Sequence, residues 1–308
     1  MLTIGSKIDE VRIDGSMERF REDLEAIMRA GAGAVELPAH GLDLVFNGKL
    51  RQTRMDEVLD ILKEYDFKIS VHSPNPLNLM DKINPGLHAD VLLACLEMAR
   101  QAGAEVVVYH AGRFIPEEKF NISPAPMLPP GKEKIHLMEQ EAFCLQTISK
   151  QYPDITIAIE NARPYLRQSP YTYGELINQL RDQVIRVNRD NVRINLDFGH
   201  LFMSSDFYGY DPAEAVRMIR KLVVHTHVHD NFGGSVYYWE KQQTHQLPFG
   251  RGDSHMPVGW GNVPVKKILD VLMPGYKGLL MMELRSRYFS HIEESRIALE
   301  KLVNQLKK

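Results

Sequence analysis

Short apolar runs that favour β-structure alternate with segments of helical period along the whole chain, and this alternation restricts the fold most. Eight strand-and-helix units are present. The expected strands are 2–6, 34–37, 68–72, 105–110, 155–160, 193–197, 223–229 and 279–284. The expected helices lie near 16–30, 54–65, 86–102, 133–151, 172–185, 212–221, 263–273 and 288–306. Repeated units of this kind are typical of a parallel sheet covered by helices.

The ends of the expected strands carry the reactive side chains. The third through eighth strands each close on a residue that can bind a metal ion, namely His72, His110, Glu160, Asp197, His227 and Glu283. An open doubly wound sheet gathers its ligands at one crevice, whereas a barrel places them at the carboxyl ends of all its strands. We therefore predict an α/β fold, a single (β/α)8 TIM barrel spanning 1–308, a length ordinary for such a domain.

Composition excludes several classes of protein. No apolar run is long enough to cross a bilayer, and no secretory signal is visible at the N-terminus, so a cytoplasmic location is expected. Cys95 and Cys144 lie in apolar helical patterns and are expected to be structural. A net charge of -3 gives no general attraction to phosphate backbones, so a nucleic-acid partner is not expected.

The run "VHTHVHDN" at 224–231 places three histidines in alternation. Side chains two residues apart on a strand share a face, so the three imidazoles point the same way. "DFGH" adds His200 in the turn after Asp197, and "DSHMPVGWG" adds Asp253 and His255 in alternation on a later loop. Zinc and manganese bind imidazole nitrogen and carboxylate oxygen, so these fragments predict a divalent metal site.

Two long loops, 111–131 and 230–262, follow expected strands, and we interpret both as walls or lids of the site. Arginines on the loops at this end could contact phosphate or could simply be exposed. They are Arg113, Arg163, Arg167 and Arg251. Arg285 shares a strand face with Glu283 and could pair with it or hold a substrate phosphate.

Seven fragments in order resemble the xylose isomerase-like TIM barrel superfamily, which includes sugar and sugar phosphate isomerases and epimerases and also endonuclease IV. They are "VHSPNPLNL", "VYHAG", "IAIEN", "DFGH", "HVHDN", "DSHMPVGWG" and "MMEL". The resemblance implies nine metal ligands, the set of the trinuclear zinc members: His72, His110, Glu160, Asp197, His200, His227, Asp253, His255 and Glu283. It selects His227 as the ligand of the histidine run and leaves His225 as a buried core residue.

The resemblance also implies a reaction. Glu160 and Glu283 would transfer a proton in the isomerisation or epimerisation of a small sugar or sugar phosphate, through an enediolate stabilised by one to three zinc or manganese ions. The expected substrate contacts are His200, His229, Arg251 and Glu36. A homo-oligomer is possible.

Two alternatives remain at this point. The same nine ligands serve cleavage of abasic DNA in endonuclease IV, and a barrel can bind metal and sugar without turnover. Glu36, the loop with Asn75 and Pro76, and the slightly acidic chain favour a sugar over DNA, which would profit from basic or stacking groups. Retention of both Glu160 and Glu283 favours an enzyme over a binding protein.

Overall fold

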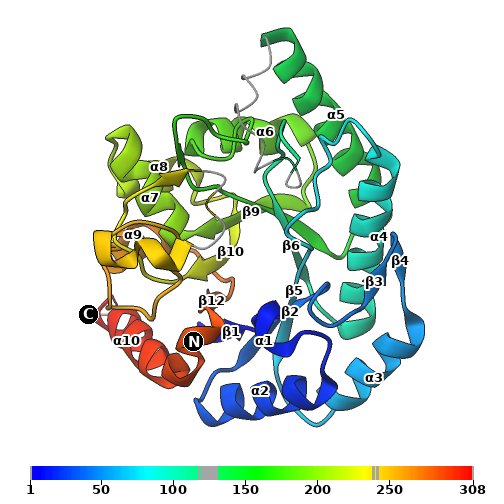
Figure 1. Ribbon diagram of the computed structural model, residues 1–308, viewed down its shortest axis with the longest axis vertical. Coiled ribbons are helices and arrows are strands. Elements are labelled where there is room, and N and C mark those ends of the chain that lie inside the picture. Colours follow the sequence, from blue (N-terminus) through cyan, green and yellow to red (C-terminus); the bar gives the residue numbers. More distant parts are fainter. Residues whose placement is uncertain (1, 117–118, 120–130, 238–239, 241–242, 307–308) are drawn as a thin grey trace.

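Eight parallel strands form a closed barrel in the order β1-β12-β10-β9-β7-β6-β5-β2. The computed structural model describes residues 2–116, 119, 131–237, 240 and 243–306. The barrel strands are β1 (Ile4–Lys7), β2 (Ala34–Pro38), β5 (Lys68–His72), β6 (Val106–His110), β7 (Thr156–Glu160), β9 (Val192–Asp197), β10 (Val223–Val228) and β12 (Leu280–Met282). The predicted (β/α)8 TIM barrel is confirmed, and Figure 1 shows helices arranged around the strands.

The described residues contain ten α-helices, most of which surround the barrel (Figure 1). They are α1 (Glu10–Ile13), α2 (Met17–Arg29), α3 (Gln52–Leu62), α4 (Pro85–Ala102), α5 (Gly131–Ser149), α6 (Ile177–Val187), α7 (Phe198–Tyr208), α8 (Pro212–Ile219), α9 (Val265–Leu272) and α10 (Ile292–Gln305). Two 3-10 helices, η2 (Gln243–Phe249) and η3 (Ser286–His291), lie in the loops after β10 and β12. No helix in the described part of the chain is both long and apolar enough to cross a membrane.

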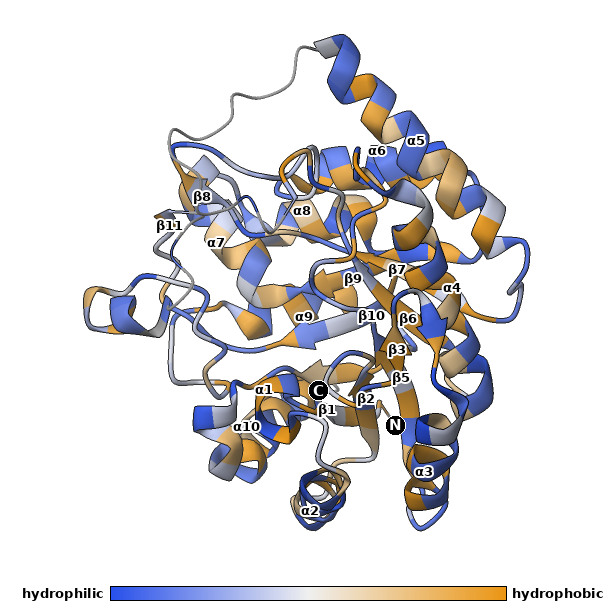
Figure 2. Ribbon diagram, turned by 45° about the vertical axis from the view of Figure 1, so that its right-hand side comes forward, coloured by the Kyte–Doolittle hydropathy of each residue, from blue (hydrophilic) through white to orange (hydrophobic). Residues whose placement is uncertain are grey.

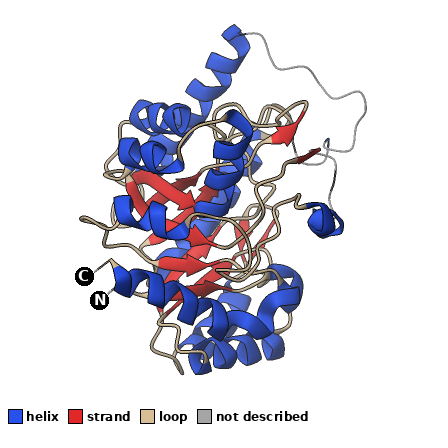
Figure 3. Cartoon of the chain, turned by 90° about the vertical axis from the view of Figure 1, so that its left-hand side faces the viewer, coloured by secondary structure: helices blue, strands red, loops and turns tan. Residues whose placement is uncertain are grey.

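The layer between the strands and the helices is apolar, as the alternation predicts. The strand residues are coloured as hydrophobic in Figure 2, and the strands lie inside a layer of helices in Figure 3. Val35, Val107, Ile159 and Leu196 are fully buried between strands and helices. Burial of such side chains contributes about 1.5–3 kcal/mol each. The apolar strands and the helical faces that cover them therefore hold the strand ends in place.

The structure corrects the expected elements at three points. A helix, α7, begins directly after β9, so His200 lies in the first turn of a helix and not in an open turn. The last strand is shorter than expected, and Glu283 stands one residue beyond it. The helix predicted at 172–185 begins at Ile177, because residues 172–176 form turns and bends.

The loops after β7 and β10 are joined by a small parallel sheet. Its strands are β8 (Tyr165–Leu166) and β11 (Val236–Tyr237), and Val236 pairs with Tyr165. A second small sheet, β3 (Val45–Phe46) with β4 (Lys49–Leu50), follows β2. Most of the predicted wall at 111–131 lies outside the described residues. The wall at 230–262 is described except for 238–239 and 241–242.

Candidate metal centre at the barrel mouth

Four side chains from four strand ends meet at the centre of the mouth. We call Glu160, Asp197, His227 and Glu283 the inner cluster, because one ligand atom from each lies within 4.8 Å of the others. His227 Nδ1 lies 3.3 Å from Glu160 Oε2, 3.2 Å from Glu283 Oε2 and 4.0 Å from Asp197 Oδ2. Three carboxylates around one imidazole form a compact anionic group that suits a divalent cation.

Glu160 also belongs to a second group, the side cluster of His72, His110 and Glu160. His72 Nε2 lies 3.8 Å and His110 Nε2 lies 3.7 Å from Glu160 Oε2. The Nδ1 atom of His72 lies 2.7 Å from the carbonyl oxygen of Ser73 and must donate to it. Nε2 of His72 then carries a lone pair, and it is buried with no hydrogen-bond partner in the described part of the chain. An orphaned acceptor of this kind fits a metal ligand.

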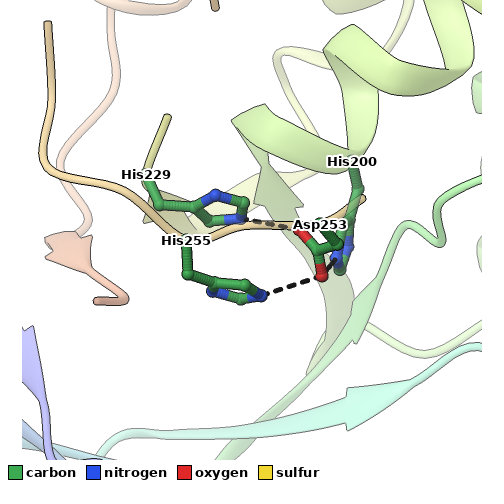
Figure 4. Close-up of side chains that lie close together, drawn as sticks. All are labelled: His200, His229, Asp253 and His255. Atoms are coloured by element: carbon green, nitrogen blue, oxygen red, sulfur yellow. Dashed lines mark hydrogen bonds and ion pairs between the residues drawn. The ribbon is translucent and has the colours of Figure 1, made fainter. Parts of the chain in front are cut away.

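His200, His229, Asp253 and His255 form the outer cluster, shown in Figure 4. Asp253 Oδ2 lies 2.8 Å from His255 Nε2 and 3.2 Å from His200 Nε2. His229 stacks on His255 with ring centroids 3.9 Å apart, and its Nε2 lies 3.7 Å from Asp253 Oδ1. The outer cluster therefore offers three imidazoles and a single carboxylate.

Backbone carbonyls fix the tautomers of two outer histidines. His200 Nδ1 lies 2.9 Å from the carbonyl oxygen of Asn161, and His255 Nδ1 lies 3.0 Å from that of Glu283. Because a carbonyl only accepts, each Nδ1 donates and each Nε2 is left facing Asp253. The residues of the three clusters thus fit metal binding by donor type and by orientation.

Burial and neighbouring charges shift the pKa values of residues in the inner and side clusters. Burial disfavours ionisation of Glu160, but His227, His110 and His200 hold its pKa well below the ordinary value. Burial also opposes the charge on Glu283, whose pKa is likewise well lowered, chiefly by Lys7 and His227. Burial lowers the pKa of His110 to about 3, so its imidazole is neutral, the form that binds metal.

Glu36 lies beneath the inner cluster and not at the mouth. It is fully buried, and its Oε1 accepts from His227 Nε2 at 2.8 Å while its Oε2 lies 2.8 Å from His225 Nε2 and 2.9 Å from Ser70 Oγ. The expectation that Glu36 contacts substrate is corrected, since Glu36 instead holds His227 with Nδ1 toward the carboxylates. His225 is fully buried, as expected of a core residue.

Local sequence explains how "DFGH" builds this end of the barrel. Asp197 caps α7, and its Oδ1 accepts the backbone N–H of His200 at 2.7 Å, while its Oδ2 lies 3.1 Å from His229 Nε2. A Cβ at Gly199 would collide with the imidazole ring of His229. Glycine is therefore required where the helix start meets that ring.

Asp230, which follows the histidine run, has a structural task. Its Oδ1 accepts from the backbone N–H of Val263 at 2.9 Å, and its Oδ2 accepts from that of Gly259 at 2.9 Å. These bonds tie the later part of the loop to the end of β10. Asp230 therefore anchors the segment that carries Asp253 and His255.

A cavity of about 290 Å³ opens above the clusters, at the small end of the range for ligand pockets. Its wall carries four cationic side chains, Lys7, Arg113, Arg163 and Arg285. Sequence reasoning missed Lys7, whose Nζ lies 3.0 Å from Glu283 Oε1 and 2.9 Å from Glu10 Oε2. Its signal was available, because Lys7 stands at the end of the first strand.

The structure brings all nine expected ligands into the three clusters. Of the expected substrate contacts, only His200 lines the cavity. His229 is fully buried within the outer cluster, and Arg251 is exposed and does not line the cavity, so both expectations are corrected. Arg167 is exposed as well.

A model described as xylose isomerase-like TIM barrel matches residues 24–305, and no curated protein matches the chain. A D-tagatose 3-epimerase-like protein is 20% identical with a TM-score of 0.70, covering 99% of this chain and 98% of that one. The structure of 3-keto-D-glucoside 4-epimerase from E. coli is 16% identical with a TM-score of 0.68, and the match covers 98% of this chain and 100% of that one.

A third similar structure is a xylose isomerase-like TIM barrel protein from Mycobacterium smegmatis, solved in complex with magnesium. It is 12% identical with a TM-score of 0.69, and the match covers 99% of this chain and 98% of that one. At these identities the similarity establishes the barrel fold.

Proposed function

Because the chain belongs to the xylose isomerase-like TIM barrel family, we propose that it is a divalent-metal-dependent isomerase or epimerase of a small sugar or sugar phosphate. One observation carries the proposal. Glu160 and Glu283 reach the same space from β7 and from the end of β12, and each has a carboxylate oxygen within 3.3 Å of His227 Nδ1. Two carboxylates that reach one site from different strands can each exchange a proton with a bound sugar.

The inner cluster is the proposed metal site, with Glu160, Asp197, His227 and Glu283 as ligands. A zinc or manganese ion bound there would act as a Lewis acid toward the carbonyl and hydroxyl of an α-hydroxy ketone or aldehyde. Glu36 orients His227 for this task from below. The side and outer clusters could bind up to two more ions.

The chain's own carboxylates carry the proton. One ionised glutamate takes the hydrogen on the carbon beside the carbonyl as a proton, which leaves an enediolate and makes that glutamate neutral. The other glutamate, which must first have gained a proton from water, returns it to the same or the neighbouring carbon. Lys7 holds Oε1 of Glu283, and His200 Nδ1 lies 3.3 Å from Oε1 of Glu160. Both contacts favour the ionised form, which the glutamate that acts as the base needs.

The similar structures support this assignment. Two of those reported above are described as epimerases or epimerase-like proteins, and a third was solved with magnesium. The size of the cavity supports a small molecule over duplex DNA, which needs a wide positive surface. Incision of abasic duplex DNA by the zinc-loaded protein would favour the nuclease alternative instead.

Hydrogen exchange with solvent tests the proposal. The protein is stripped with a chelator, reloaded with manganese or zinc, and incubated in D₂O with a panel of ketoses and ketose phosphates. Metal-dependent entry of deuterium at the carbon next to the carbonyl, together with formation of the epimer or aldose, is expected. Tight binding of a panel sugar without deuterium entry would favour a non-catalytic binding protein.

A further inference from the structure

We infer that the sugar handled at this site carries an acidic group, a phosphate or a carboxylate, and that Arg285 binds it together with Arg163. The inference rests on the proposed function and names the substrate class of the same cavity. Both guanidinium groups belong to residues that line the cavity, and they reach it from different strand ends.

Arg285 is a half-buried cation without a carboxylate partner in the described residues. Its Nη2 donates to the carbonyl oxygen of Asp253 at 2.8 Å, and its Nε is buried with no hydrogen-bond partner in the same part of the chain. A guanidinium away from water that has unused donors is unfavourable by itself. An anionic ligand would use both its charge and its donors.

Arg163 also contacts Asp253, at its side chain. Its Nη1 lies 3.0 Å from Asp253 Oδ2 and 3.3 Å from His200 Nε2, and its side chain is 21% exposed. Its Nε is also buried without a hydrogen-bond partner among the described atoms. Arg163 and Arg285 therefore converge on Asp253, one at its carboxylate and the other at its backbone.

The remaining cations around the cavity do not explain Arg285. Lys7 is engaged by Glu10 and Glu283, and Arg113 donates to the carbonyl oxygen of Asn75. Sugar hydroxyls need donors and acceptors but no excess positive charge. A second guanidinium beside an already paired one favours a ligand with a localised negative charge, since a planar fork matches phosphate and carboxylate oxygens.

Anion binding tests the inference without turnover. Inorganic phosphate and acetate are titrated into the manganese-loaded protein and into Arg285→Met and Arg285→Lys. Arg287→Met is the matched control, because Arg287 is exposed and lies two residues away. We expect the dissociation constant of at least one anion to rise about tenfold or more in Arg285→Met, less in Arg285→Lys, and not in Arg287→Met.

The circular dichroism spectrum and melting temperature of each variant show whether the fold is kept. If Arg285→Met does not fold, Arg285→Lys carries the test, because it keeps the charge and loses the planar fork. Phosphate and acetate binding that is equal in the wild type and in the folded Arg285 variant would overturn the inference, as would no binding of either anion to the wild type.

Kinetics separate this inference from the proposed function. Ketose phosphates, keto sugar acids and neutral ketoses are compared in the wild type and in Arg285→Met. A loss in kcat/KM for one acidic class that exceeds the loss for neutral ketoses by about tenfold or more supports the inference and identifies the acidic group. If neutral and acidic sugars are turned over equally, and Arg285→Met does not change their ratio of kcat/KM, the inference is overturned while the proposed isomerase activity is retained. Phosphate binding that depends on Arg285, without turnover of any sugar, would support the inference and contradict the proposed isomerase or epimerase activity.

Discussion

The inner and outer clusters use the same kinds of ligand in different proportions. The inner cluster has three carboxylates, Glu160, Asp197 and Glu283, around His227. The outer cluster has one carboxylate, Asp253, among three imidazoles. Asp253 already has a cationic partner, since Arg163 lies 3.0 Å from its Oδ2. The inner cluster has Lys7 as its cationic neighbour, on Glu283.

The two clusters differ in how much positive charge is needed to balance their carboxylates. Burial lowers the pKa of His227, yet Glu36, Glu283 and Glu160 raise it well above the ordinary value. Burial likewise lowers the pKa of His200 in the outer cluster, yet Asp197 and Asp253 raise it well above the ordinary value. What separates the two clusters is therefore the number of carboxylates, three against one. In the outer cluster Arg163 supplies much of the charge that Asp253 needs. We accordingly place the tightest ion and the chemistry in the inner cluster.

Removal of one inner carboxylate charge has the largest expected effect. Glu283→Gln keeps the size of the side chain but removes both the metal-binding charge and the base. We expect kcat on the preferred sugar to fall by about 10³-fold or more. The exposed Glu293→Gln is the control and should be unaffected. Near-normal turnover by Glu283→Gln would refute its role.

A matched pair of aspartates compares the clusters directly. Asp197→Asn preserves the cap on α7, because asparagine caps as well as aspartate, but it removes the charge and places an NH2 group in place of the Oδ2 that faces His229 Nε2. We expect it to weaken binding of the tightest manganese ion by about 100-fold. Asp253→Asn should weaken the same ion less than about tenfold. Titration of the metal-free proteins measures both constants, and the reverse order would contradict the assignment of the tight site.

Glu36 tests the inner cluster separately from substrate binding, because it contacts His227 but does not line the cavity. Glu36→Gln keeps a possible partner for Nε2 of His227 but loses the carboxylate. We expect manganese affinity to fall by about 10-fold to 100-fold, the usual cost of losing such a support. Ser70→Ala, which removes a single hydrogen bond to Glu36, should have a smaller effect. Equal affinity in Glu36→Gln and the wild type would remove Glu36 from the account.

Glu141 provides a reference carboxylate away from all three clusters. It accepts from Tyr109 Oη and Gln183 Nε2, both at 2.8 Å, and burial raises its pKa to about 7 from an ordinary 4.5. A raised pKa in the folded state means that stability is fully present below pH 4.5 and is lost as pH rises through 7.

Unfolding by urea at pH 5 and pH 8 therefore checks this group. The wild type should lose up to about 3 kcal/mol of unfolding free energy between these values through Glu141. In Glu141→Gln, the decline in unfolding free energy between pH 5 and pH 8 should be smaller than in the wild type by up to about 3 kcal/mol. An unchanged pH dependence would show that Glu141 has an ordinary pKa.

The fold and the ligand set could be predicted from sequence because both follow from position along strands. Apolar runs of strand length predicted β5, β6 and β7, and His72 and His110 are the last residues of β5 and β6. A side chain at a strand end must lie near its neighbours once the barrel closes.

Contacts set by depth and orientation could not be predicted. Glu160 is the last residue of β7, whereas Glu36 lies two residues before the end of β2, and its carboxylate faces His225 and His227 below the mouth. Arg251 stands close to Asp253 in sequence but is exposed, whereas Arg163 reaches Asp253 from another loop. Loop paths decide such cases, and they depend on tertiary packing that no local pattern encodes.

Anomalous diffraction from crystals of the zinc-loaded protein tests the central claim most directly. We predict the strongest peak in the inner cluster, within about 2.0–2.2 Å of oxygen or nitrogen atoms of Glu160, Asp197, His227 and Glu283. A strongest peak in the outer cluster, or zinc bound only at the protein surface, would contradict the account.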